Sequence, residues 1–218
     1  MKAIIIGATG ATGKELVQRL INDQTFNQIT VLVRKKSFEN HPKLKEVIVN
    51  FEHLDQFKHE IYADVAFSCL GTTLKIAGSK ANQWKVDFDY QLQFAQLAKE
   101  NHIKTFVLLS AFGANSASKI FYSKMKGKLE EQIVKLNFPQ TIIVKPASLI
   151  RPNSNRPFEK FSVKLIQQLN KFGILKNFTP ISVFDLSYIL LQSVKNFKSK
   201  IVFLQMPEIL KITTAKKS

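Results

Sequence analysis

The feature that most constrains this chain is a glycine-rich segment, residues 7–13, which reads GATGATG. Three of the eight glycines stand there at a regular spacing of three, directly after the apolar run at residues 3–6. Between a strand and a helix, Gly7 permits a tight turn, Gly10 lets the backbone approach a pyrophosphate, and Gly13 lets the helix pack closely on the strand. We therefore predict a dinucleotide-binding turn and not a flexible loop.

The helix expected after this turn supports the same prediction. Its free N–H groups would point at a bound anion. Thr12 is placed either to cap this helix or to offer its hydroxyl to a phosphate. The alternative is a tight strand-to-helix turn that holds no ligand.

Apolar, strand-like runs alternate with helical patterns along the chain. The predicted strands are residues 2–6, 29–33, 46–50, 65–70, 105–109 and 141–144, and the predicted helices are residues 12–22, 80–101, 118–136, 159–170 and 184–196. This rhythm predicts an α/β fold, a Rossmann-type doubly wound parallel sheet covered on both faces.

The length of 218 residues and the hydrophobic content of 45% allow one well-buried core, so residues 1–218 are expected to form a single domain. Prolines and asparagines at residues 151–157 interrupt the alternation. From about residue 151 onward we expect a small C-terminal substrate lobe. The tail at residues 213–218 is expected to fray.

Composition limits which cellular compartment and which binding partners we expect for this chain. The 32 basic and 16 acidic residues give a net charge of +16, but the lysines are scattered, which is typical of a solvated surface. Since no nucleic-acid-reading module is present, we expect no nucleic-acid partner. The single cysteine, Cys69, and the absence of a membrane-length apolar run or a secretory signal favour a cytoplasmic protein without a membrane partner. The four histidines form no ligand pattern, so no metal is expected.

The end of the second predicted strand indicates which dinucleotide binds. An NAD site favours an acidic residue there, whereas this chain has Arg34, Lys35 and Lys36. Positive charges suit a 2′-phosphate, and Arg34 can also stack on adenine. We therefore predict NADP(H) in preference to NAD(H). The alternative is that these are ordinary surface cations.

A Tyr-x-x-x-Lys pair, Tyr122 and Lys126, carries the predicted chemistry. Residues four apart share one face of a helix, so Lys126 can bring its charge near the Tyr122 phenol and the ribose hydroxyls. That charge favours the phenolate that a general acid or base uses. Ser110, at the end of the preceding strand, could bond a substrate oxygen. The alternative is a helix whose tyrosine packs and whose lysine is solvated.

Several segments together resemble the Tat-interacting-protein branch of the atypical short-chain dehydrogenase/reductase superfamily. This branch is NmrA-like, binds NAD(P)H and includes bacterial epimerase-like members. The segments are GATGATGKELVQRL, VRKKSF, NFEHLD, CLGTTLKIAG and LLSAFGANSASKIFYSKMKGKLE, and the resemblance runs from residue 1 to about Arg151. It implies an NADPH-binding Rossmann-type sheet and matches Ser110, Tyr122 and Lys126 to the superfamily's Ser-Tyr-Lys triad.

The resemblance also assigns the cofactor contacts. They are Gly7, Thr9, Gly10, Ala11, Thr12, Gly13, Arg34, Lys35, Leu70, Gly71 and Thr72. Where many relatives carry an aspartate that contacts adenine, this chain has Asn50 followed by Phe51, and an amide can still bond adenine. After the sixth strand, Lys145 precedes Pro146, and residues 146–149 are expected to line the nicotinamide end.

Together these residues predict an NADP(H)-dependent oxidoreductase or epimerase-like enzyme that acts on a small carbonyl or alcohol substrate. In this interpretation Tyr122 exchanges the proton, Lys126 holds the ribose and Ser110 orients the reacting oxygen. The alternative is a non-catalytic NADPH-binding regulator or redox sensor that contacts a protein partner. A monomer or a homodimer is expected.

Overall fold

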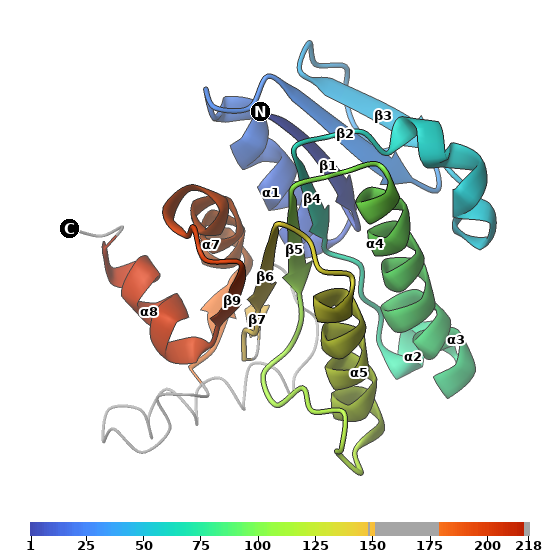
Figure 1. Ribbon diagram of the computed structural model, residues 1–218, viewed down its shortest axis with the longest axis vertical. Coiled ribbons are helices and arrows are strands. Elements are labelled where there is room, and N and C mark those ends of the chain that lie inside the picture. Colours follow the sequence, from blue (N-terminus) through green and yellow to red (C-terminus); the bar gives the residue numbers. More distant parts are fainter. Residues whose placement is uncertain (148, 151–178, 216–218) are drawn as a thin grey trace.

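The computed structural model describes residues 1–147, 149–150 and 179–215. Its main sheet has seven parallel strands in the order β3-β2-β1-β4-β5-β6-β9 (Figure 1). The strands are β1 (Lys2–Ile6), β2 (Gln28–Val33), β3 (Leu44–Ile48), β4 (Val65–Ser68), β5 (Thr105–Leu109), β6 (Gln140–Val144) and β9 (Ile201–Leu204). The predicted Rossmann-type, doubly wound parallel sheet is confirmed.

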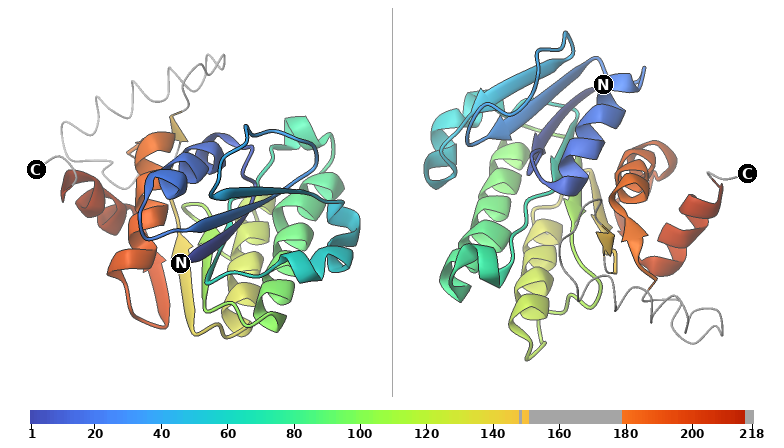
Figure 2. Two further views of the ribbon diagram at one scale, coloured as in Figure 1. Left: turned by 90° about the horizontal axis from the view of Figure 1, so that it is seen from above. Right: turned by 180° about the vertical axis from the view of Figure 1, so that it is seen from behind.

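Helices cover both faces of this sheet. The helices are α1 (Ala11–Asn22), α2 (Leu74–Ala77), α3 (Lys80–Trp84), α4 (Tyr90–Glu100), α5 (Phe121–Lys135), α7 (Val183–Asn196) and α8 (Met206–Ala215). Figures 1 and 2 show α1 and α7 side by side on one face and α4 and α5 on the other. A 3-10 helix, η1 (Phe51–Glu60), follows β3, and a π-helical turn, η2 (Lys85–Asp89), joins α3 to α4.

The position of β1 inside the sheet, with helices on both faces, explains why its sequence is continuously apolar. Ile5 belongs to the core cluster beneath α1 and α7, whereas Ile4 and Ile6 belong to the cluster beneath α4 and α5. All three side chains are fully buried. Strands of a parallel sheet with helices on both faces read as hydrophobic runs without alternation, as residues 3–6 do.

The last part of the described chain completes the sheet. Strand β9 pairs in parallel with β6, and neither β9 nor α8 was predicted from the sequence. Because α8 extends to Ala215, the expectation of a frayed tail from residue 213 is wrong up to that residue. Two short strands, β7 (Leu149–Ile150) and β8 (Ile181–Ser182), pair beside the main sheet. The predicted helix at residues 159–170 and most of the expected substrate lobe lie outside the described residues.

Three local predictions differ from the structure. Gly10 is the N-cap of α1, so Thr12 lies inside the first turn and the prediction that it caps the helix is wrong. The helix expected at residues 80–101 is interrupted by the π-turn η2, which inserts one extra residue into the helical turn. Helix α5 begins at Phe121, three residues later than expected, because residues 113–118 instead form turns of the preceding loop.

Leu190→Ala tests how firmly the C-terminal elements belong to the core. Leu190 is fully buried on α7, in the cluster shared with α1. We expect the free energy of unfolding to fall by about 2–5 kcal/mol, because the truncation leaves a cavity. Urea denaturation should still show one transition, and Gln192→Ala, on the same helix and only partly buried, should change stability by about 0.5 kcal/mol or less. Equal stability of the two variants would contradict this packing.

Candidate functional site

The predicted site residues gather at the carboxyl edge of the sheet, because all parallel strands end on the same side. Those that follow a strand within four residues are Gly7, Thr9 and Gly10 (β1), Arg34 and Lys35 (β2), Asn50 and Phe51 (β3), Leu70, Gly71 and Thr72 (β4), Ser110 (β5) and Pro146 (β6). Tyr122 and Lys126 lie in the first two turns of α5, which begins on this edge (Figure 1). Ligands of open parallel sheets bind at such an edge.

The glycine segment makes the tight turn that its sequence predicts. Gly7 has a φ of +77°, a conformation that other residues rarely adopt, and a Cβ on it would lie 2.3 Å from the backbone carbon of Cys69. A Cβ on Gly13 would lie 2.1 Å from the Gly7 carbonyl oxygen. The N–H of Gly10 donates to that same oxygen at 3.0 Å. Only glycine at positions 7 and 13 allows helix and strand to approach this closely.

The amino end of α1 is open toward this edge. Thr9, Gly10 and Ala11 are exposed, whereas Thr12 is buried. The first turn of the 12-residue helix contains no acidic residue, and its N-cap residue, Gly10, has no side chain to cap it. Its leading N–H groups and the positive end of its dipole therefore suit an anion such as a phosphate.

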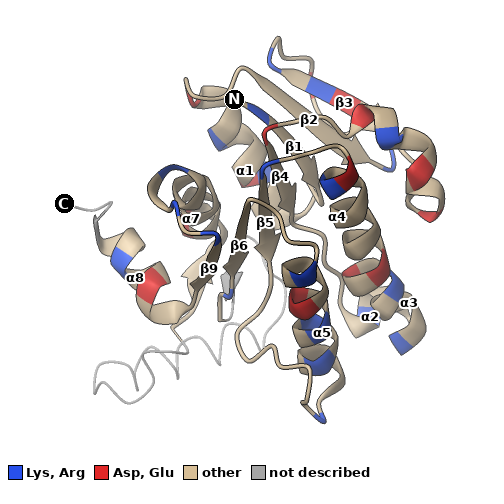
Figure 3. Ribbon diagram, viewed as in Figure 1, with Lys and Arg blue, Asp and Glu red and all other residues tan. Residues whose placement is uncertain are grey.

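Beyond the second strand, Arg34, Lys35 and Lys36 are all exposed. Burial, and to a smaller extent a hydrogen bond to Glu52, raise the pKa of Tyr90 to about 12. The charge of Arg34 acts on the same phenol and lowers its pKa. The Tyr90 ring lies 5.6 Å from the Phe51 ring. Arg34 therefore belongs to a polar and aromatic cluster at the β2 and β3 end of the edge. Over the whole molecule the basic residues are spread across several elements and not gathered in one block (Figure 3).

The two residues predicted to contact adenine have different surroundings. Asn50 is exposed and caps η1, since its side-chain oxygen accepts from the N–H of Glu52 at 3.0 Å. Its amide nitrogen still has two hydrogens to donate. The side chain of Phe51 packs in the core cluster beneath α4 and α5 and offers little surface to a ligand.

Lys126 is held at this edge by a residue that the sequence did not single out. Its side chain is almost fully buried, and Nζ lies 3.2 Å from Oδ1 of Asp87, on the π-turn η2. The other oxygen of Asp87 accepts from the N–H of Thr72 at 3.0 Å. Burial raises the pKa of the Cys69 thiol to about 12, and the charge of Lys126 acts in the opposite direction and lowers it. The only signal for Asp87 in the sequence is an acidic residue between Val86 and Phe88 in a helical pattern.

Tyr122 is 41% exposed, whereas Lys126, one turn further along α5, is 2% exposed. The alternative in which the tyrosine packs and the lysine is solvated therefore does not fit this helix. The Tyr122 phenol is therefore open to a substrate, whereas Lys126, four residues further along the helix, is shielded from water.

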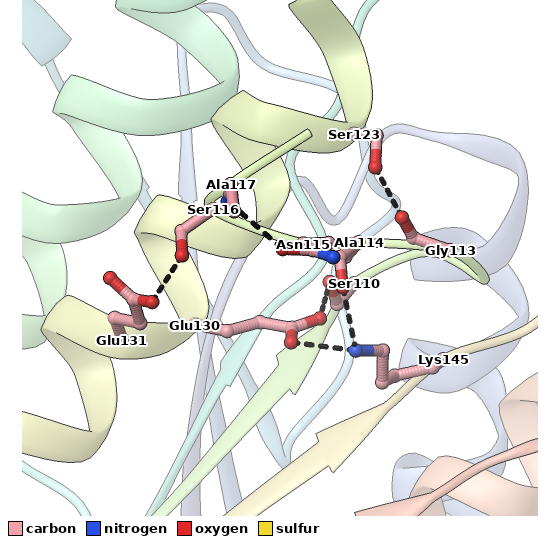
Figure 4. A network of polar contacts seen from close by, with 10 residues as sticks. All are labelled: Ser110, Gly113, Ala114, Asn115, Ser116, Ala117, Ser123, Glu130, Glu131 and Lys145. Atoms are coloured by element: carbon pink, nitrogen blue, oxygen red, sulfur yellow. Dashed lines mark hydrogen bonds and ion pairs between the residues drawn. The ribbon is translucent and has the colours of Figure 1, made fainter. Parts of the chain in front are cut away.

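Ser110 is bound to a second buried network (Figure 4). Its hydroxyl donates to Oε1 of Glu130, and Oε2 of Glu130 lies 2.7 Å from Nζ of Lys145. Lys145 also donates to the carbonyl oxygen of Ala114 at 3.2 Å. Because a hydroxyl has one proton, Ser110 in this arrangement offers only lone pairs to a substrate oxygen. Its predicted catalytic role therefore stays a prediction.

A hollow of about 480 Å³ lies on the flank of α5. It is lined by Ala114, Asn115, Ser116, Gly127, Glu130, Glu131, Val134, Lys135 and Phe203. None of these residues belongs to the predicted cofactor set, but Ala114 and Glu130 are also part of the Ser110 network. Within the part of the chain that the structure describes, no group of three or more His, Cys, Asp or Glu side chains is placed to hold a metal ion.

Comparisons with known proteins agree with this geometry. A family described as NAD(P)H-binding matches residues 7–154. Protein FMP52, mitochondrial, of Eremothecium gossypii is 37% identical over 69% of this chain and 67% of its own length. Protein HTATIP2 of Rattus norvegicus is 35% identical over 76% of this chain and 70% of its own length. The structure of MoeE5 with UDP-glucose and NAD has a TM-score of 0.71 at 12% identity, covering 99% of this chain and 82% of MoeE5, and it shows the same fold.

The predicted cytoplasmic location is wrong on these comparisons. The FMP52 relatives from several yeasts carry the designation mitochondrial in their names. The sequence signal was too coarse, because a low cysteine count separates oxidising from reducing compartments but does not distinguish one reducing compartment from another. Among the described residues, no helix is both long enough and apolar enough to cross a membrane.

Glu130→Gln tests the network that holds Ser110. Both side chains of the Glu130 and Lys145 pair are largely buried, so removing the carboxylate leaves an unpaired ammonium in the interior. We expect the free energy of unfolding to fall by about 3–5 kcal/mol in urea denaturation. The double variant Glu130→Gln/Lys145→Met should recover much of this loss.

The exposed pair of Lys58 and Glu100 provides the matched control. Glu100→Gln removes the same charge and should change stability by about 0.5 kcal/mol or less, because solvent screens that pair. If the Glu130→Gln protein were as stable as the Glu100→Gln protein, the buried pair of Glu130 and Lys145 would not contribute to the stability of the fold.

Proposed function

The chain belongs to the NAD(P)H-binding family, and we propose that it is an NADP(H)-dependent oxidoreductase or epimerase-like enzyme acting on a small carbonyl or alcohol substrate. The match to HTATIP2 agrees with the resemblance to the Tat-interacting-protein branch. The observation that carries the proposal is the pairing of an exposed Tyr122 with a buried Lys126 at the same sheet edge as the glycine turn.

The glycine turn and the start of α1 supply the cofactor cradle. Gly7, Gly10 and Gly13 bring the backbone close, and the exposed N–H groups of the first helical turn face the place where a pyrophosphate would lie. Within the part of the chain that the structure describes, no side chain covers Gly10, whose Cβ would have only the Gly7 carbonyl oxygen nearby, at 3.3 Å. The residues present therefore fit a dinucleotide.

The preference for NADP(H) rests on charge at the end of β2. Arg34 and Lys35 are exposed where the adenosine ribose of a dinucleotide would lie, and neither forms an ion pair among the described residues. The neighbouring carboxylate of Glu52 is bound by Lys85 and Tyr90, and these contacts lower its pKa. Two cations without carboxylate partners favour a 2′-phosphate over a 2′-hydroxyl.

When bound, the nicotinamide would supply or accept the hydride. Tyr122 is the group of this chain placed to give a proton to the substrate oxygen, or to take it in the opposite direction. Lys126 has three N–H donors and one carboxylate partner, so it can also donate to the ribose hydroxyls. Ser110 would have to leave Glu130 before it could donate to the substrate oxygen.

The cofactor assignment is tested by calorimetric titration with NADPH and NADH. The wild-type chain should bind NADPH at least tenfold more tightly than NADH, and Arg34→Ala should remove most of that preference while leaving NADH affinity nearly unchanged. Lys104→Ala, an exposed lysine that precedes β5, is the control for loss of one positive charge. Equal affinity of the wild-type chain for both dinucleotides would exclude the NADP(H) preference.

The chemical assignment is tested with Tyr122→Phe and a panel of small carbonyl substrates. Since the variant retains the ring and loses the proton donor, we expect turnover of NADPH to fall by about 100-fold or more, with unchanged NADPH affinity. Tyr62→Phe, on an exposed tyrosine at the opposite end of the sheet, should have no effect on turnover. Tight NADPH binding without turnover of any carbonyl by the wild-type chain would favour the alternative of a non-catalytic NADPH-binding regulator.

A further inference from the structure

The strongest unexplained feature of the molecule is the buried carboxylate of Asp87. Its side chain is 1% exposed, in the π-turn between α3 and α4. Oδ1 has an ion-pair contact with Lys126 but no hydrogen-bond partner, and it is the one buried side-chain polar atom in that state among the described residues. Burying a charged group with an acceptor that has no hydrogen-bond partner costs free energy, so the position of Asp87 calls for an explanation.

The surroundings of Asp87 hold it rigidly. The side-chain amide of Gln91 donates to the Asp87 backbone carbonyl at 2.9 Å, and the Gln91 side-chain oxygen accepts from the Ser68 hydroxyl at 2.8 Å. Both Gln91 and Ser68 are fully buried. Since Ser68 ends β4, this chain of contacts fixes the π-turn to the carboxyl end of a central strand. π-Helical turns occur frequently at functional sites.

The two oxygens of Asp87 face two different parts of the expected cofactor site. Oδ2 accepts from the N–H of Thr72, in the loop after β4, and Oδ1 faces the ammonium of Lys126 on α5. A Cβ on Gly71 would lie 3.5 Å from Oδ1, so the loop backbone passes close to the carboxylate. Asp87 is therefore the side chain that joins the loop at residues 70–72 to the lysine.

We propose that Asp87 is a positioning residue that sets the Lys126 ammonium and the loop at residues 70–72 at one mutual distance, so that both can meet a bound dinucleotide. This inference rests on the proposed function. Without the carboxylate, the buried ammonium of Lys126 would lose its counter-ion and turn away from the edge, and the dinucleotide would lose the donors that Lys126 offers. Asp87 acts through Lys126 and takes no proton from the substrate.

The test is a double-mutant cycle on NADPH affinity, measured by calorimetry on the full chain. Asp87→Asn keeps the shape and an acceptor for Thr72 but removes the charge, and it should raise the NADPH Kd at least tenfold. Asp89→Asn removes the same charge two residues away on the same turn, from an exposed side chain, and should change the Kd less than twofold. In a Lys126→Met background, Asp87→Asn should change the Kd less than twofold, because no ammonium remains to be positioned.

A merely structural role predicts a different pattern. If Asp87 acted only by holding the loop through Thr72, Asp87→Asn, which keeps that acceptor, would leave the NADPH Kd nearly unchanged even in the presence of Lys126, and the proposal would be overturned. If Asp87→Asn alone fails to fold, as circular dichroism would show, the comparison of Lys126→Met with the double variant still decides, because neither leaves a buried ammonium unpaired. A tenfold weaker double variant would overturn the proposal.

The outcome also separates this inference from the proposed function. If the wild-type chain binds neither NADPH nor NADH, the proposed function fails and the role of Asp87 fails with it. If the wild-type chain binds NADPH and Asp87→Asn binds it as tightly as Asp89→Asn does, the proposed function stands and the positioning role alone is wrong.

Discussion

The close approach of α1 to the end of β1 is the constraint on which the candidate site depends. A side chain at Gly13 would meet the Gly7 carbonyl oxygen at 2.1 Å, so the helix can start where it does only without one. That start places the free N–H groups of α1 at the carboxyl edge of the sheet. Because all seven strands of the main sheet are parallel, the loops after β2, β4, β5 and β6 begin at this same edge.

Helix α5 connects this cradle to the expected chemistry. Tyr122, Lys126 and Glu130 follow one another at intervals of four along the helix, and each has a different environment. Tyr122 is exposed, Lys126 is paired with Asp87, and Glu130 bridges Ser110 and Lys145. Two buried ion pairs thus fix one face of the helix against two different neighbours. Since a broken buried pair costs far more than an exposed one, this face is held in one position.

Much of the fold could be predicted because its signals are local. The glycine spacing and the apolar runs of β1, β2 and β5 report backbone needs that each segment has by itself. Strand β9 is also an apolar run, but it was missed because it has only four residues, and periodicity cannot identify so short a run as a strand. The π-turn was missed because a single inserted residue leaves the helical pattern of residues 80–101 almost unchanged.

By itself the sequence determined the parallel sheet, the tight glycine turn and the placing of Tyr122 and Lys126 four residues apart on one helix, because strand runs, glycine positions and a four-residue interval act within one segment. Only the tertiary structure decided which partners the polar side chains find. Asp87 meets Lys126 across 39 positions of the chain, and Ser110 gives its proton to Glu130 across 20, so neither pairing has a local pattern. The ion pairs of buried charged groups depend on which residues the folded chain brings close together. Composition and spacing in the sequence therefore do not identify these pairs.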